Sequence, residues 1–132
     1  MLMNVKVITS SSTKIVEGVT RLHLKTIEGD ITILPKHYPL ITAIDVSKVT
    51  FIKGKEEKVY AFASSGILNV KETEVILLLN AFEFKDDIDV NRAEASKLRA
   101  EERINSHNEK VDMARAEASL KRTLLRIKIA QS

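Results

Sequence analysis

The pattern of hydrophobic and polar positions changes character near Lys85. Before it, short runs rich in Val, Ile, Thr and Leu alternate with polar residues, which is typical of strands with one buried face. After it, Ala, Glu, Lys, Arg and Leu dominate, which favours helices. All four glycines and both prolines precede this point, and six of the seven arginines follow it. We therefore expect two domains, residues 1–85 and residues 86–132.

The first domain is predicted to be all-β. In the segment 19–27, odd-numbered residues from Val19 to Lys25 alternate with even-numbered residues from Thr20 to Thr26, so the two sets should occupy opposite faces. Two hairpins are predicted, one turning at 53–55 and one at Lys71-Glu72. Many short strands joined by tight turns indicate an antiparallel β-sandwich or a flattened barrel. The predicted strands are 5–9, 19–27, 46–53, 58–63, 66–70 and 73–79.

The second domain is predicted to be an αα-hairpin. Asp89 is placed to cap a helix that runs from about Val90 to about Ile104, because its carboxylate can accept N–H groups of the first turn. Residues 105–108 are polar and poor in helix formers, which indicates a turn. Ser106 and Glu109 have the spacing of a capping box for a second helix, ending at about Ala130. The fold class is therefore mixed α and β, segregated, with an N-terminal sandwich and a C-terminal two-helix hairpin.

A repeat lies inside the predicted hairpin. The segment 92–96 recurs, letter for letter, at 115–119, and the next arginines also correspond, Arg99 with Arg122 and Arg103 with Arg126. Each helix thus carries arginines at positions i, i+7 and i+11, which share one face. Two such stripes are suited to a polyanion held between the helices. The same pattern is also compatible with two similar helices whose arginines are simply solvated.

Composition narrows the classes of protein that fit. The chain has 132 residues, 44% of them hydrophobic, and no apolar run long enough to span a bilayer. The N-terminus lacks the pattern of a signal peptide and there are no cysteines, so we expect the cytoplasm or the cytoplasmic side of a membrane. The three histidines are scattered and predict no metal site.

Two functional classes are disfavoured by the residues themselves. The net charge is +3 and only 5% of residues are aromatic, without the concentrated basic face or the stacking pattern of a nucleic-acid-binding protein. No nucleophile–base pair, phosphate-binding Gly-rich loop or metal-ligand cluster indicates a stand-alone enzyme.

Three segments resemble the epsilon subunit of bacterial F-type ATP synthases. Residues 29–42 are similar to its signature loop, in which a Gly-acidic strand leads into Pro-x-His-x-Pro-Leu. Residues 65–70 resemble its second glycine strand, and residues 88–93 match the Ile/Leu-Asp-x-x-Arg-Ala motif that starts its helical hairpin. The resemblance covers essentially the whole chain. It departs from the family pattern at Lys36, where Gly is usual, and at Ser65 and Asn69, which replace a frequent Gly and Glu.

The resemblance implies a rotor subunit of the central stalk that couples ion flow to ATP synthesis and is not an enzyme. Its implied partners are the gamma subunit, the ring of c subunits and, when the hairpin extends, the alpha and beta subunits. The extended hairpin would inhibit ATP hydrolysis, and ATP, a regulatory ligand rather than a required cofactor, would hold it folded. The implied location is the cytoplasmic face of the bacterial membrane, peripheral and only through the complex.

The resemblance also assigns residues. Asp30 is implied as a contact to the c ring. A purely structural rotor adaptor, without nucleotide sensing, remains the alternative for the hairpin. The residues implied to bind ATP are Glu83, Ile88, Asp89, Arg92, Arg99, Arg115, Arg122 and Arg126.

Overall fold

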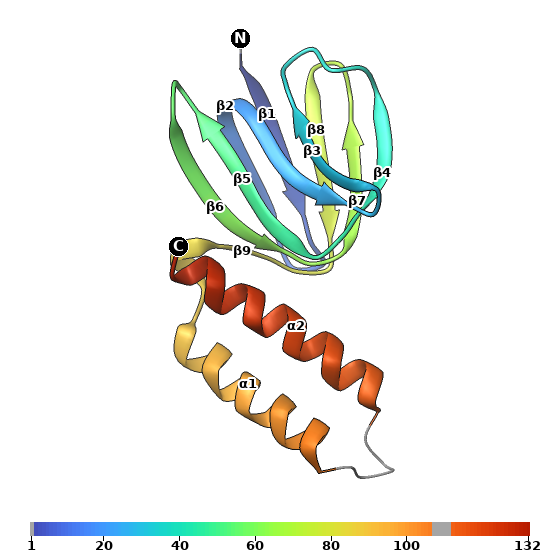
Figure 1. Ribbon diagram of the computed structural model, residues 1–132. Helices are drawn as coiled ribbons and strands as arrows, with labels where there is room; N and C mark the ends of the chain where they lie inside the picture. The colour runs from blue at the N-terminus through green and yellow to red at the C-terminus, as the bar shows by residue number, and fades with distance from the viewer. Residues whose placement is uncertain (1, 107–111) are drawn as a thin grey trace. The chain divides into compact units, whose positions relative to one another are not determined.

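The computed structural model describes residues 2–106 and 112–132 (Figure 1). The chain divides into two compact units, Met1–Phe84 and Lys85–Ser132. The predicted fold class, a β-sandwich followed by two packed helices, is confirmed. The described elements are β1 (Met3–Ile8), β2 (Thr13–Thr26), β3 (Gly29–Ile33), β4 (Leu40–Ile44), β5 (Ser47–Lys53), β6 (Glu57–Ala63), β7 (Gly66–Val70), β8 (Glu74–Leu79), β9 (Phe82–Phe84), η1 (Lys85–Asp87), α1 (Val90–Asn105) and α2 (Met113–Ala130).

The strands of the first unit follow the order β1-β8-β7-β4-β2-β5-β6-β9, with β3 paired to β2. β1 also pairs with β2, so the long second strand joins the two layers of the sandwich. The pairings are antiparallel except that of β1 with β8, which is parallel. The interior holds a continuous apolar core, and removing this area from water is the main stabilising term of such a unit. Its largest fully buried members include Leu22, Leu24, Phe51, Leu68 and Leu77.

Both predicted β-hairpins are confirmed. β5 pairs with β6 across a turn in which Gly54 has a φ of 56°, a conformation that favours glycine. β7 pairs with β8, and the N–H of Lys71 donates to the carbonyl oxygen of Glu74 at 2.8 Å. β3, β4 and β9 were not predicted from the pattern; β4 is mostly apolar without alternation, and β9 has only three residues.

The predicted alternation in the second strand is wrong at one point. Val19 and Leu22 are both fully buried although they are three residues apart, so Val19 does not share a face with Arg21 and Lys25. Two register shifts in β2 cause this, one against β1 beside Gly18, whose φ is 70°, and one against β5 between Val19 and Arg21. A bulge adds one residue to a strand and reverses the alternation beyond it.

Asp89 caps α1, as predicted, and its carboxylate accepts the N–H of Arg92 at 3.0 Å. The predicted capping box at Ser106 is wrong: Ser106 is the C-cap of α1, and Asp112 caps α2 instead. The physical reason is that Asp112 is an equally good N-cap closer to the apolar stripe of α2. The predicted turn residues His107 and Asn108, together with Glu109, lie outside the described residues.

The two helices run side by side in opposite directions (Figure 1). Small side chains allow this approach, since Ala93, Ala100 and Ala116 are all buried. Larger buried groups come from the second half of α2, where Thr123 and Ile127 are buried. Neither described helix is long and apolar enough to cross a membrane.

Candidate polyanion site and interaction surfaces

The repeat found in the sequence is a repeat of helix caps. Asp89 Oδ1 accepts the N–H of Arg92 at 3.0 Å, and Asp112 Oδ1 accepts the N–H of Arg115 at 3.1 Å. The backbone carbonyl oxygen of each capping aspartate accepts the N–H four residues further on, that of Ala93 in α1 and that of Ala116 in α2, at 3.0 Å in both helices. Each helix therefore starts with the same Asp-x-x-Arg geometry, which fixes an arginine in its first turn.

An open pocket of about 680 Å³ lies between the end of α1 and the start of α2. Its volume falls in the range of small-ligand sites, roughly 300–1,000 Å³. Three arginines from both helices converge on it, together with one carboxylate. The residues that line it are Arg103, Asp112, Arg115, Ala116, Ala118, Ser119 and Arg122.

The lining of this pocket carries more positive than negative side chains, three arginines against one aspartate. In the sandwich, Arg21 pairs with Glu56 at 3.6 Å and Lys25 pairs with Asp45 at 3.8 Å. Within the part of the chain that the structure describes, Arg103, Arg115 and Arg122 form no such ion pair. Arginine donates through a planar fork that suits phosphate and carboxylate oxygens, so the arrangement can hold a small polyanion.

The structure brings only part of the implied ATP-binding set to this pocket. Arg115 and Arg122 line it. Ile88 is buried and Asp89 caps α1, both at the end of α1 that lies away from the pocket. Arg92 lies in the first turn of α1. It is separated from Arg103, which lines the pocket, by eleven residues of helix, or about 16 Å along the helix axis.

The other implied residues lie elsewhere. Arg99 is exposed, and its Nη2 donates to Ser96 Oγ at 3.0 Å. Arg126 is half-buried and already has an interaction within the chain. Glu83 lies in β9 of the first unit, where its backbone is paired with Phe62. The resemblance did not imply Arg103 as a binding residue. The sequence repeat did point to it, because Arg103 occupies the same position in the first helix as Arg126 in the second.

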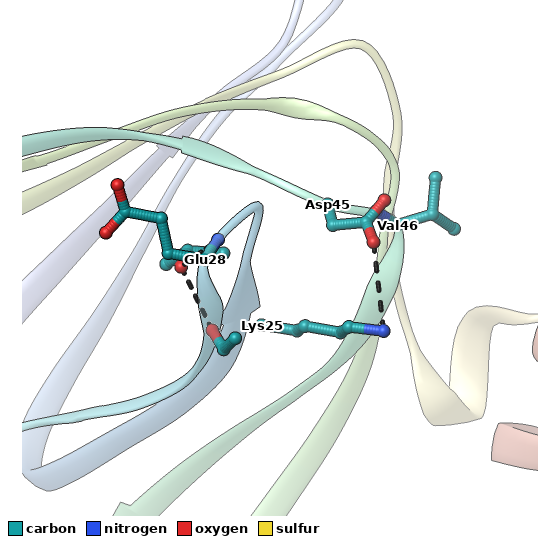
Figure 2. A network of polar contacts seen from close by, with 6 residues as sticks. Lys25, Glu28, Asp45 and Val46 are labelled. Atoms are coloured by element: carbon teal, nitrogen blue, oxygen red, sulfur yellow. Dashed lines mark hydrogen bonds and ion pairs between the residues drawn. The ribbon is translucent and has the colours of Figure 1, made fainter.

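Asp30, the implied c-ring contact, is exposed on β3 and paired across the sheet with Lys25 of β2. The turn before it is held by Thr26, whose Oγ1 donates to the carbonyl oxygen of Gly29 at 3.0 Å and accepts the N–H of Glu28 at 3.2 Å. Lys25 reaches away to Asp45, as Figure 2 shows. Asp30 is therefore exposed to solvent near the start of β3, directly after a turn that Thr26 holds by two hydrogen bonds.

The sandwich also exposes an apolar surface on the outer side of β1, β4, β7 and β8. In its centre Ile67 lies opposite Leu78 on one side and Ala43 on the other. Ile41, Ile67 and Leu78 are 72%, 46% and 41% exposed, unusual values for three large aliphatic side chains on neighbouring strands. We call this surface the outer apolar face; its members are Ile8, Ile41, Ala43, Ile67, Ile76 and Leu78.

The part of the chain that the structure describes holds no group of three or more His, Asp or Glu side chains that could bind a metal ion. Its features are an arginine-lined pocket on a helical hairpin and an apolar sheet face. These two features are typical of a protein that binds ligands and assembles with partners.

Family comparison agrees with this class. Residues 2–85 match the family described as ATP synthase, Delta/Epsilon chain, beta-sandwich domain, and residues 86–131 match the corresponding long alpha-helix domain. The chain belongs to the ATP synthase delta/epsilon chain family, whose epsilon chains are non-catalytic subunits. The resemblance found in the sequence is thereby confirmed.

Individual relatives span most of the chain. The ATP synthase epsilon chain of Halalkalibacterium halodurans is 38% identical over 130 residues, covering 97% of this chain and 96% of the relative. That of Shouchella clausii is 43% identical over 109 residues, covering 82% and 79%.

Solved structures share the fold at low identity. A chain of the Euglena gracilis mitochondrial ATP synthase matches with a TM-score of 0.67 at 14% identity, covering 98% of this chain and 78% of that one. A chain from the central stalk and c-ring of the Tetrahymena thermophila mitochondrial enzyme gives 0.56 at 12% identity, covering 98% and 93%.

Proposed function

We propose that this chain is a rotor subunit in the central stalk of a bacterial F-type ATP synthase and helps to couple ion flow to ATP synthesis. The observation that carries the proposal is the match of both units, in order, to a family whose relatives here are bacterial ATP synthase epsilon chains. It would act at the cytoplasmic face of the membrane, as a peripheral subunit held there by the complex.

The sandwich would supply the docking surfaces. The outer apolar face is suited to the gamma subunit, because burying large aliphatic side chains supplies most of the free energy of a stable interface. The exposed carboxylate of Asp30 is suited to a polar contact with the ring of c subunits.

The hairpin would regulate ATP hydrolysis. When extended it would reach the alpha and beta subunits and inhibit hydrolysis, and ATP would hold it folded. A ligand shifts such an equilibrium only through its different affinity for the two states. Arginines on both helices favour the folded state as the binding form, since separating the helices separates their charges.

Calorimetric titration of the full chain with ATP and ADP, with and without magnesium, tests the regulatory part. Arg92→Ala and Arg126→Ala are compared with the unchanged protein. We expect saturable binding that prefers ATP and is lost in both variants. Absence of binding at millimolar ATP would favour the structural adaptor over the sensor, and binding that both variants retain would exclude Arg92 and Arg126 as ATP ligands.

A further inference from the structure

We propose that the segment Lys85–Asp89 is a latch that closes the open end of the helical hairpin. Its last residue, Asp89, caps the start of α1. Its first residue, Lys85, binds the end of α2, where its Nζ donates to the backbone carbonyl oxygen of Ser132. The bond from Lys85 forms only while the two helices are packed together, so it favours the packed hairpin over the separated one.

The position of the latch follows from the direction of the helices. At one end of the hairpin the chain itself connects α1 to α2. At the other end, which we call the open end, α1 begins at Val90 and α2 ends at Ala130, side by side because the helices run in opposite directions (Figure 1). α2 also contacts η1, the turn that precedes α1. The bond between Lys85 and Ser132 therefore joins the two helices where no covalent connection does.

Hydrogen bonds at the end of α2 position the carbonyl group that Lys85 binds. The N–H of Gln131 donates to the carbonyl oxygen of Ile127 at 3.1 Å. The N–H and the Oγ of Ser132 both donate to the carbonyl oxygen of Ile129, at 3.1 and 2.7 Å. These bonds satisfy carbonyl groups of the last turn and fix the orientation of Ser132. Its own carbonyl oxygen then accepts from the Lys85 ammonium group.

The charges of the segment match the helix ends that it contacts. The N-terminus of a helix carries a partial positive charge and the C-terminus a partial negative charge. Asp89 lies at the positive end of α1, and Lys85 lies at the negative end of α2. Lys85 is also the one basic residue of the segment, beside three aspartates. Its substitution therefore leaves only negative side chains next to the negative end of α2.

The two contacts of the segment differ in how they depend on packing. Asp89 caps the helix that directly follows it, so its bond persists when α2 moves away. Lys85 loses its acceptor in the same movement. A contact present in only one of two states shifts their equilibrium by its own free energy. Charges at helix ends change such equilibria by about two- to fivefold at low salt, so loss of the Lys85 bond should favour separated helices by that factor.

Energy transfer between two dyes on the full chain tests the latch. The sequence contains no cysteine, so Asn91→Cys and Leu124→Cys supply two unique labelling positions, both exposed and one on each helix. The temperature at which half of the energy transfer is lost gives the midpoint of helix separation. In this labelled chain, Lys85→Gln should lower the midpoint by about 2–6 °C at low salt.

Two further variants and a salt series isolate the cause. Lys121→Gln is the matched control, because it removes the same charge from an exposed position in the middle of α2, and it should change the midpoint by less than about 1 °C. Lys85→Arg keeps a cationic donor and should restore most of the loss. In about 1 M NaCl the effect of Lys85→Gln should fall by more than half, because the contact is exposed and charges are screened within about 3 Å. Circular dichroism confirms that each variant is helical before heating.

Three results would overturn the proposal: an unchanged midpoint in Lys85→Gln, an equal decrease in Lys121→Gln, or a decrease that salt does not reduce. The latch rests on the proposed function only in its consequence, that a hairpin which opens more readily binds ATP more weakly. ATP titration of the same variants separates the two proposals. A lowered midpoint without ATP binding in any variant would mean that the nucleotide proposal fails alone. ATP binding with an unchanged midpoint would mean that the latch fails alone.

Discussion

Gly66 lies directly against the backbone of Leu78 on the neighbouring strand. A Cβ atom added to Gly66 would stand 2.0 Å from the Leu78 carbonyl oxygen and 2.9 Å from its carbonyl carbon. β7 and β8 are paired here from Gly66 to Val70, so neither backbone can withdraw without breaking the ladder. The glycine is thus required by close approach rather than by backbone conformation.

Gly66→Ala should therefore lower the free energy of unfolding of the sandwich by about 2–4 kcal/mol, as overpacking against backbone does. Urea unfolding of the full chain measures it. Gly54→Ala is the control, because Gly54 has a positive φ but open space around it, and it should cost only about 1–2 kcal/mol. A loss at Gly66 no larger than that at Gly54 would contradict the steric explanation.

The two helix caps should be energetically equivalent. Asp89→Ala and Asp112→Ala each remove one carboxylate acceptor from a first turn, and each should destabilise the hairpin by about 1 kcal/mol. The helical signal in circular dichroism, followed through thermal unfolding, reports the change. Asp89→Asn and Asp112→Asn serve as controls, since asparagine caps as well as aspartate does, and unequal losses for the two alanine variants would argue against a repeated cap.

Lys36 has a φ of 63°, a left-handed conformation that costs a residue with a Cβ about 1–2 kcal/mol. Lys36→Gly should remove this strain and raise the free energy of unfolding by about 0.5–1 kcal/mol after the greater freedom of glycine in the unfolded chain is subtracted. The matched control is Lys71→Gly, at a loop position with negative φ, which should destabilise. Chemical denaturation distinguishes the two, and a loss of stability in Lys36→Gly would refute the strain argument.

The outer apolar face should matter for assembly and little for stability. Ile67→Lys places a charge at its centre, where Ile67 is paired with Leu78 and Ala43. If the gamma subunit covers this face, affinity in a co-purification or surface-binding assay should fall by at least about tenfold. Leu98→Lys, on the exposed side of α1, is the control and should bind normally, because Leu98 is 61% exposed on the other unit. Unchanged binding of Ile67→Lys would place the interface elsewhere.

Local chemistry made much of the hairpin predictable. The Asp89 cap and the start of α1 at Val90 were read correctly, because capping depends on a side chain and the first few N–H groups that follow it. The start of α2 was placed too early, since two capping candidates compete there and local pattern does not rank Ser106 against Asp112. For the candidate site, the sequence revealed the arginine repeat but did not show which of these arginines line the same pocket.

Residue patterns alone predict the two units, the sandwich-then-hairpin order, most of the strands and the family, because periodicity, turn residues and short motifs are local properties. The remaining features depend on contacts between segments that lie far apart in the chain. The bulges in β2 arise because this strand pairs with both β1 and β5. The sequence of β2 alone does not show that both partners are present. Antiparallel packing of α1 against α2 brings Arg103 to Arg115 and Arg122 and leaves Arg92 at the far end, because proximity across a hairpin depends on where both helices begin and end.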